Sequence, residues 1–228
     1  MKKASGSEYI DIHTHSARDS GIYVMNVFAQ DLEQGISEGV MCSIGLHPWH
    51  LEDQDINKCM ALLRNYAPDP HVLAIGEAGL DRNIQTSLEK QKEVFVRHII
   101  LSEQVKKPLI IHCVKSYSDV LEIRKTDGWK MPWMMHWFNE NISIANELIR
   151  WGCYLSFGRS LLHPNGRNAE VFRNVPPEYV FFETDDAEIA IGSVYAKAAE
   201  VRGIPVDELQ RIVAANFEKI FYKANKRE

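Results

Sequence analysis

The chain has 228 residues, of which 45% are hydrophobic and 25% are charged; these values are typical of a globular protein and exclude a disordered or fibrous chain. The net charge of −5 lacks the basic excess of nonspecific nucleic-acid binders, so any nucleic-acid activity would depend on a local basic patch and on metals. No apolar stretch reaches the roughly 18 residues of a membrane span, and the N-terminus carries no apolar signal core, so we predict a cytoplasmic protein without a membrane partner.

Eight short apolar runs recur along the chain, and segments with helical character separate most of them. Amphipathic or charged stretches such as 86–106 and 116–126 lie between runs, and 205–223 predicts a final helix. This alternation favours parallel βαβ units, and eight strands predict an α/β, TIM-barrel-like (β/α)8 fold with residues 1–228 as one domain. The predicted strands are 9–13, 22–28, 40–47, 72–79, 108–113, 133–138, 153–158 and 179–185.

The connection between the first two predicted strands is unusually short. Residues 14–21 are fewer than the dozen or more that a parallel crossover normally needs. Either the helix after the first strand is missing and the barrel is locally irregular, or 22–28 is not a barrel strand. We expect eight strands, with the helix after the first strand missing.

The first run ends in three polar residues at alternate positions, Asp11, His13 and His15. Alternation places all three on one face of a strand, where they could bind a divalent metal. Two metallohydrolase families open with an Asp-x-His-x-His strand. One of them, the polymerase-and-histidinol-phosphatase family, expects Ser-Asp-Gly after the histidines and a late Asp-x-His pair. Residues 19–21 instead read Asp-Ser-Gly, and no Asp lies two positions before the last histidine, His163.

Four later runs also end in polar residues that can bind metal: Glu77, His112, His136 and Asp185. A barrel collects the C-terminal ends of its strands at one mouth, so these side chains are expected to converge with His13. Four histidines and two carboxylates suit two divalent metal ions better than one. The imidazole-rich set favours zinc, manganese or iron over magnesium, although magnesium stays open.

The motif series "DIHTH", "GLHP", "IGEAGLD", "PLIIHC", "MMHWF", "YLSFG", "ETD" and "NFEKIF" resembles the TatD family of metal-dependent hydrolases, in the family's order over residues 9–222. The resemblance implies an amidohydrolase-type TIM barrel and metal-dependent hydrolysis of DNA, in a shortened member of the family. It implies one metal among His13, His15, Glu77 and Asp185, and a second metal that Glu77 shares with His112 and His136. It also implies that Asp185 orients or deprotonates the attacking water.

Other residues near the expected mouth have two interpretations each. Asp11 could support a ligand imidazole from behind, or be a buried acid paired with a Lys or Arg. His47 could contact the substrate, or be a turn residue before Pro48. Arg82 and Arg159 could bind phosphate, or form surface salt bridges.

His98 lies in the amphipathic stretch 86–106, and we expect it to face solvent.

The sequence therefore predicts a metal-dependent hydrolase, with DNA phosphodiesters as the leading substrate and DNA as a transient partner. The acidic charge balance is compatible with an exonuclease that grips only a strand end. The alternative is a small-molecule hydrolase that cleaves an ester, amide or phosphoester at the same metal site, since the segments "WFNEN" and "SFGRSLLHPNGRN" differ from the family at the rim. A metal-bound protein without catalysis is a third possibility. No obligate protein partner is expected.

Overall fold

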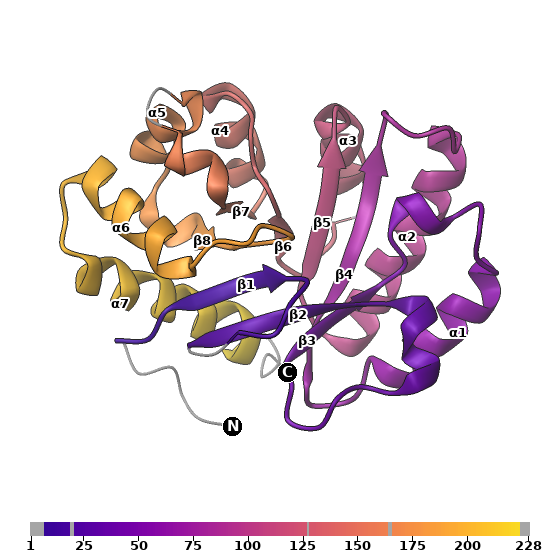
Figure 1. The fold of residues 1–228 in the computed structure, drawn as a ribbon. Helices are drawn as coiled ribbons and strands as arrows, with labels where there is room; N and C mark the ends of the chain where they lie inside the picture. Colours follow the sequence, from indigo (N-terminus) through magenta and orange to yellow (C-terminus); the bar gives the residue numbers. More distant parts are fainter. Residues whose placement is uncertain (1–6, 19–20, 127, 164–165, 224–228) are drawn as a thin grey trace.

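The computed structural model describes residues 7–18, 21–126, 128–163 and 166–223. Eight parallel strands lie in one sheet in sequence order, and together they form a nearly closed barrel (Figure 1). The prediction of eight barrel strands is confirmed. The strands are β1 (Ile10–Thr14), β2 (Ile22–Phe28), β3 (Cys42–Gly45), β4 (Val72–Asp81), β5 (Leu109–Val114), β6 (Trp133–Met135), β7 (Cys153–Phe157) and β8 (Val180–Phe182).

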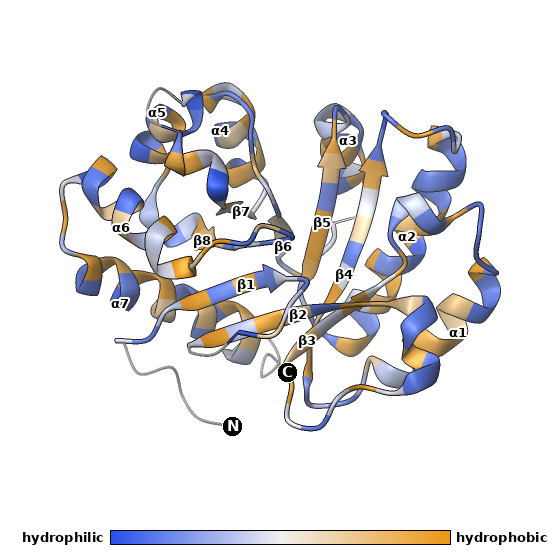
Figure 2. Ribbon diagram, in the orientation of Figure 1, coloured by the Kyte–Doolittle hydropathy of each residue, from blue (hydrophilic) through white to orange (hydrophobic). Residues whose placement is uncertain are grey.

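The helices lie on the outside of the barrel and include the predicted ones at 86–106, 116–126 and 205–223. Figure 2 shows β5 almost entirely hydrophobic, whereas the helices carry hydrophilic and hydrophobic residues on different sides. Among the described helices, none has both the length and the apolar character that crossing a bilayer requires. They are α1 (Ile56–Tyr66), α2 (Leu88–Val105), α3 (Tyr117–Thr126), α4 (Ile142–Arg150), α5 (Arg167–Asn174), α6 (Ile191–Arg202) and α7 (Val206–Phe217), with short 3-10 helices at Ala29–Gln34, Pro48–His50, Arg159–Leu162 and Pro177–Tyr179 and a π-helical turn at Glu218–Lys223.

Strands β1 and β2 are parallel neighbours despite their short connection. Ile10 pairs with Ile22, and the amide of Ile22 donates to the carbonyl of Tyr9 at 2.9 Å. The described residues of the connection, 15–18 and 21, form no helix, and Asp19 and Ser20 lie outside the described residues. The helix after the first strand is therefore missing, and the register of the pair shifts within β1. The local irregularity predicted for this part of the barrel is confirmed.

The barrel closes between β8 and β1 near its mouth. The amide of Asp185 donates to the carbonyl of His13 at 2.9 Å, and the amide of His15 donates to the carbonyl of Asp185 at 3.2 Å. These bonds fix Asp185, which follows β8, directly beside the two histidines that end β1. The seam thus joins residues from opposite ends of the chain at the predicted site.

Farther from the mouth, side chains from two helices bond to the edges of the seam. The hydroxyl of Tyr195 on α6 accepts from the amide of Ile10 at 3.2 Å and donates to the Ile10 carbonyl at 3.1 Å. The Asn216 amide on α7 donates to the carbonyls of Val180 and Pro177, at 3.0 and 2.9 Å. Buried backbone groups need such partners, so α6 and α7 stabilise the barrel at the point where strand pairing ends.

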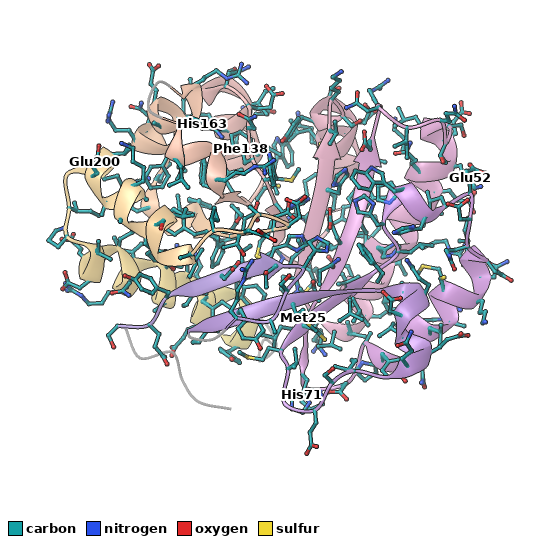
Figure 3. All side chains as sticks on the ribbon, viewed as in Figure 1. Met25, Glu52, His71, Phe138, His163 and Glu200 are labelled. Atoms are coloured by element: carbon teal, nitrogen blue, oxygen red, sulfur yellow. The ribbon has the colours of Figure 1, made fainter. Side chains whose placement is uncertain are left out.

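Side chains fill the interior of the barrel and the space under the helices (Figure 3). Phe95 packs edge to face on Trp133, with ring centroids 5.6 Å apart, and Phe138 packs in the same way on Phe157 at 5.8 Å. All four rings are fully buried or nearly so. Aromatic pairs of this kind add to the energy of area burial, and they hold the strands that carry the site.

His98 corrects one prediction. It lies on α2 but is fully buried and does not face solvent. Its Nε2 accepts from the amide of Leu46 at 3.0 Å, and its Nδ1 lies 2.8 Å from the carbonyl of Val94. One ring nitrogen thus accepts and the other donates, which satisfies a neutral imidazole in the core. Burial lowers the pKa of His98 to about 4.

Candidate metal centre

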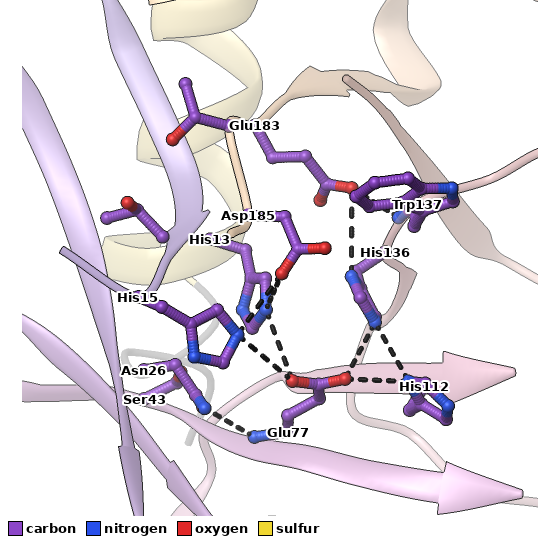
Figure 4. A network of polar contacts seen from close by, with 12 residues as sticks. His13, His15, Asn26, Ser43, Glu77, His112, His136, Trp137, Glu183 and Asp185 are labelled. Carbon is purple, nitrogen blue, oxygen red and sulfur yellow. Dashed lines mark hydrogen bonds and ion pairs between the residues drawn. The ribbon is translucent and has the colours of Figure 1, made fainter. Parts of the chain in front are cut away.

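Four histidines and two carboxylates converge at the C-terminal ends of the strands (Figure 4). They come from five strands or the residues that follow them: the end of β1, the C-terminal half of β4, the end of β5, the residue after β6 and the segment after β8. The structure therefore brings together all six predicted ligands, which are His13, His15, Glu77, His112, His136 and Asp185.

Glu77 lies at the centre and presents each carboxylate oxygen to a different pair of imidazoles. Oε2 lies 3.3 Å from Nε2 of His13 and 3.7 Å from Nε2 of His15. Oε1 lies 2.8 Å from Nδ1 of His112 and 2.8 Å from Nε2 of His136. The carboxylate thus has the arrangement of a group that can be shared between two cations.

Asp185 completes the first of these two groups. Its Oδ1 lies 3.4 Å from Nε2 of His13 and 3.2 Å from Nε2 of His15. Its backbone has a φ of +52°, in the left-handed region that non-glycine residues rarely adopt. The seam hydrogen bonds with β1 hold it there.

The donor atoms fit a divalent metal. His13, Glu77 and His136 place one ligand atom each within 4.8 Å of one another, and so do His13, His15 and Asp185. His13 is fully buried, and neither of its ring nitrogens has a hydrogen-bond partner among the described residues. Such a nitrogen is costly unless something binds it, and imidazole with carboxylate is a donor set that zinc and manganese accept.

The electrostatics of the cluster favour positive charge. Burial raises the pKa of Glu77, but the charge of His136 and the close contacts of His112 and His13 hold that pKa well below its usual value. Burial lowers the pKa of His15, but its hydrogen bonds with Asp185 and Glu77 raise it to about 9. The carboxylates therefore stay ionised and attract cations.

Two further carboxylates lie behind the imidazoles, and the sequence interpretation missed both. The first is Asp81, at the end of β4. Its Oδ2 lies 3.1 Å from Nε2 of His112 and 2.8 Å from the indole Nε1 of Trp49. Burial raises the pKa of Asp81, but the hydrogen bonds from His112 and Trp49 lower it to about 2. Asp81 therefore fixes the orientation of His112 and leaves its Nδ1 facing Glu77.

The second is Glu183, which follows β8 and is fully buried. Its Oε1 lies 3.7 Å from Nδ1 of His136 and accepts a hydrogen bond from the amide of Trp137. The sequence signal for both was alternation, since Asp81 lies four positions after Glu77 and Glu183 lies two positions before Asp185.

Asn26 on β2 was also missed. Its Oδ1 accepts from the amide of Glu77 at 3.0 Å and lies 3.4 Å from Oγ of Ser43. Asn26 thus holds the backbone at the central carboxylate. A lone Asn within a strand gave no sequence signal for this role.

Asp11 does not support a ligand imidazole from behind. Its carboxylate accepts from the amide of Thr184 at 3.1 Å and from the Thr184 hydroxyl at 2.6 Å, and Oδ2 lies 3.8 Å from Nε of Arg18. Burial raises its pKa to about 6. These contacts match the other interpretation, a buried acid paired with an arginine, and they tie β1 to the segment after β8.

His47 lies deeper in the site than a rim residue. Its Nδ1 accepts from the amide of Trp49 at 3.2 Å, and its Nε2 lies 3.1 Å from Oε1 of Glu77. Burial lowers its pKa to about 4, so the ring is neutral and carries its proton on Nε2. His47 therefore donates to Glu77, and its contact with substrate stays a prediction.

The two arginines proposed for phosphate have other partners. Arg82 lies 2.7 Å from Asp119, which Lys92 also contacts at 2.7 Å, so Arg82 forms the surface salt bridge of the alternative interpretation. The guanidinium of Arg159 stacks on the ring of Trp137, with its Cζ 4.7 Å from the centroid. Neither side chain is placed at the metal ligands.

Two adjoining cavities open over the cluster. The first, of about 360 Å³, includes His15, Phe28 and His47 in its lining. The second, of about 230 Å³, includes Val114 and Trp137. Both are also lined by Trp49, His112, His136, Asp185 and Asp186. A substrate group held at the cluster can thus extend to either side.

Known proteins resemble this chain in both sequence and fold. A family model described as TatD related DNase matches residues 26–222, which include four of the six cluster residues. The metal-dependent hydrolase YcfH of Escherichia coli (strain K12), described as uncharacterized, is 29% identical over 208 residues, covering 82% of this chain and 76% of that protein. Human deoxyribonuclease TATDN3 is 24% identical over 249 residues, covering 97% of this chain and 86% of that protein.

Among solved structures, the crystal structure of YjjV, a TatD homolog from Escherichia coli K12, matches with a TM-score of 0.83. The match covers 95% of this chain and 99% of that chain at 18% sequence identity. At this identity the likeness supports the barrel fold alone.

Proposed function

Since this chain belongs to the TatD-related DNase family of metal-dependent hydrolases, we propose that it hydrolyses phosphodiester bonds of DNA at a centre of two divalent metal ions. Zinc and manganese suit the imidazole-rich donors best, and magnesium is the third candidate. One ion would lie among His13, His15, Asp185 and Glu77. The other would lie among Glu77, His112 and His136.

The observation that carries the proposal is the position of Glu77. Its Oε2 faces His13 and His15 at 3.3 and 3.7 Å, and its Oε1 faces His112 and His136 at 2.8 Å each, with the neutral His47 beside them at 3.1 Å. Such a buried carboxylate needs positive charge on both sides. A pair of divalent cations supplies that charge, and in-line phosphodiester cleavage is a reaction that such pairs serve.

Asp185 would act on the attacking water beside the metal pair. When bound, the metal pair lowers the pKa of a coordinated water and neutralises charge on a phosphate oxygen. Asp185 lines both cavities, and burial raises its pKa while the close contacts of His13 and His15 hold it below the usual value. Its carboxylate is therefore ionised and can orient the attacking water and accept its proton.

Three other residues would hold the ligands in place. Asp81 accepts from Nε2 of His112, Glu183 lies behind Nδ1 of His136, and His47 donates to Oε1 of Glu77. The two carboxylates fix which imidazole nitrogen faces a metal and raise its basicity, while His47 holds the carboxylate of Glu77 in place.

A second candidate is hydrolysis of a small ester, amide or phosphoester at the same site. The cavities of about 360 and 230 Å³ are small enough for such a ligand, and the net charge of −5 does not attract a long polyanion. The proposed DNA partner would accordingly be bound transiently and by its end. The cytoplasmic location and the absence of an obligate protein partner stay predictions.

The test is digestion of labelled oligonucleotides by protein loaded with manganese, zinc or magnesium, beside panels of small phosphoesters, carboxylic esters and amides. We expect DNA to be shortened from an end, at a rate that falls steeply with added salt because phosphate contacts release counterions. Turnover of a small neutral substrate alone, insensitive to salt, would replace the DNase proposal with the second candidate. The Asp185→Asn protein is the inactive control for both panels.

A further inference from the structure

The smaller cavity is lined by both imidazoles and indoles. His112 and His136 line it together with Trp49, from the 3-10 helix Pro48–His50, and Trp137, which follows β6. Val114 adds apolar surface to the lining. A ligand that suits this space would bring one anionic group to the ligand cluster and lay a flat, largely apolar ring against an indole.

Trp49 is a fixed indole that faces solvent. Its side chain is 59% exposed, the highest fraction among the large hydrophobic residues in the described part of the chain that are exposed. Its Nε1 nonetheless donates to Asp81 at 2.8 Å, and its ring packs edge to face on His47 with centroids 4.8 Å apart. An exposed apolar ring held by polar contacts is a preformed binding surface, because little side-chain entropy is lost when a ligand covers it.

Trp137 is also fixed by its contacts. Its φ is +46°, which is uncommon for a bulky residue and persists where surrounding contacts require it. Its amide donates to the buried carboxylate of Glu183, and the guanidinium of Arg159 covers a face of its ring at 4.7 Å. Trp137 lines the cavity, whereas Arg159 is not among its lining residues.

We propose that this cavity is a subsite for a nucleobase, which stacks on Trp137 while the adjoining phosphate lies at the metal ligands. The assignment rests on the proposed function and names the part of the substrate that this cavity recognises. A nucleobase fits because every base offers a flat π-face to an aromatic side chain, without a need for specific hydrogen bonds. The cation–π contact of Arg159 helps to hold the Trp137 ring in position for such a base.

The test uses two phosphate ligands that differ in the base alone, deoxyadenosine 5′-monophosphate and 2-deoxyribose 5-phosphate. Their affinities for the manganese-loaded protein are measured by titration calorimetry, which does not depend on turnover. We expect the ligand with the base to bind about tenfold more tightly or better, as stacking on one aromatic side chain allows. Trp137→Leu should reduce that preference to about threefold or less, and Trp137→Phe should retain it.

Trp151 offers a matched control. It is also an exposed indole, 38% exposed, with a cation above its ring, since Nζ of Lys125 lies 5.6 Å from the centroid. It lies at the end of α4, and Trp151→Leu should leave the preference intact. Trp49→Leu gives a second variant of the cavity lining should Trp137→Leu fold poorly. In either variant, an unchanged affinity for 2-deoxyribose 5-phosphate shows that the phosphate-binding part of the site is intact.

Equal affinity of the wild-type protein for the two ligands would overturn the subsite, and so would a preference that survives in a folded Trp137→Leu protein or, should that variant not fold, in Trp49→Leu. The oligonucleotide digestion is scored separately. DNA cleavage without a base preference removes the subsite and leaves the proposed function standing. A base preference lost in Trp137→Leu, without DNA cleavage, removes the DNase proposal and supports the subsite.

Discussion

Asp81 and His112 are joined by a hydrogen bond, with Oδ2 of the carboxylate 3.1 Å from Nε2 of the imidazole. Because this bond turns Nδ1 toward Glu77, the account predicts that Asp81→Asn weakens metal binding by about 10- to 100-fold. Metal affinity is measured by competition with a chelator. Asp119→Asn, which weakens the ion pairs with Arg82 and Lys92, is the matched control, and equal affinities in the two variants would remove Asp81 from this role.

Asp185 is predicted to act on the attacking water. Its carboxylate lines both cavities and lies 3.2 Å from His15. Asp185→Asn keeps the size of the side chain but cannot accept the proton, so turnover should fall by more than about tenfold. Thermal unfolding of the variant should match the wild type. A metal-loaded variant with unchanged turnover would exclude Asp185 as the proton acceptor.

Tyr195 is predicted to stabilise the seam of the barrel. Its hydroxyl satisfies both the amide and the carbonyl of Ile10, and its removal leaves buried backbone groups without a partner. Tyr195→Phe should therefore lower the free energy of unfolding by about 1–3 kcal/mol, measured by urea denaturation. Tyr222→Phe is the control, because that hydroxyl makes a long contact to Met41 at 3.9 Å. Equal stability of both variants would mean that the seam does not need the hydroxyl.

His98 is predicted to make stability depend on pH. Its pKa is about 4 in the folded protein, lowered by burial, against about 6.5 in an unfolded chain. Between these values the unfolded chain binds more protons, so stability falls as the pH drops from about 6.5 to 4, by up to about 3 kcal/mol, and is regained above.

His98→Gln should be less stable than the wild type at neutral pH, because its amide cannot reproduce both bonds to Leu46 and Val94. It should also lose this part of the pH dependence. Urea unfolding at a series of pH values measures both effects. A variant with the same slope as the wild type between pH about 4 and 6.5 would assign the slope to other groups.

The eight strands could be predicted because each is an apolar run, and the six cluster residues because five of these runs end near a histidine or carboxylate. The residues behind the ligands could not be predicted with the same ease. Asp81 and Glu183 act through contacts to His112 and His136, which lie on other strands. Local sequence gives their face of the strand and not their partner.

The contacts of His98 could not be predicted from local sequence either. The period of α2 marks a buried face, yet it does not tell that an imidazole on that face finds the amide of Leu46, which is 52 positions away. The predicted strands 133–138 and 179–185 also run past the observed ends of β6 and β8. At these points the chain turns at Trp137 and Asp185, which both have a positive φ. A tryptophan or an aspartate gives no sequence signal for that backbone conformation.

The central claim is that Glu77 is shared between two metal ions. The most direct test is the metal content per chain after incubation with manganese or zinc and removal of free metal, measured by elemental mass spectrometry. We expect about two ions per chain for the wild type, about one for His136→Ala, and fewer than one for Glu77→Ala. A wild-type protein that holds about one ion or none, with the fold intact, would contradict the dinuclear centre.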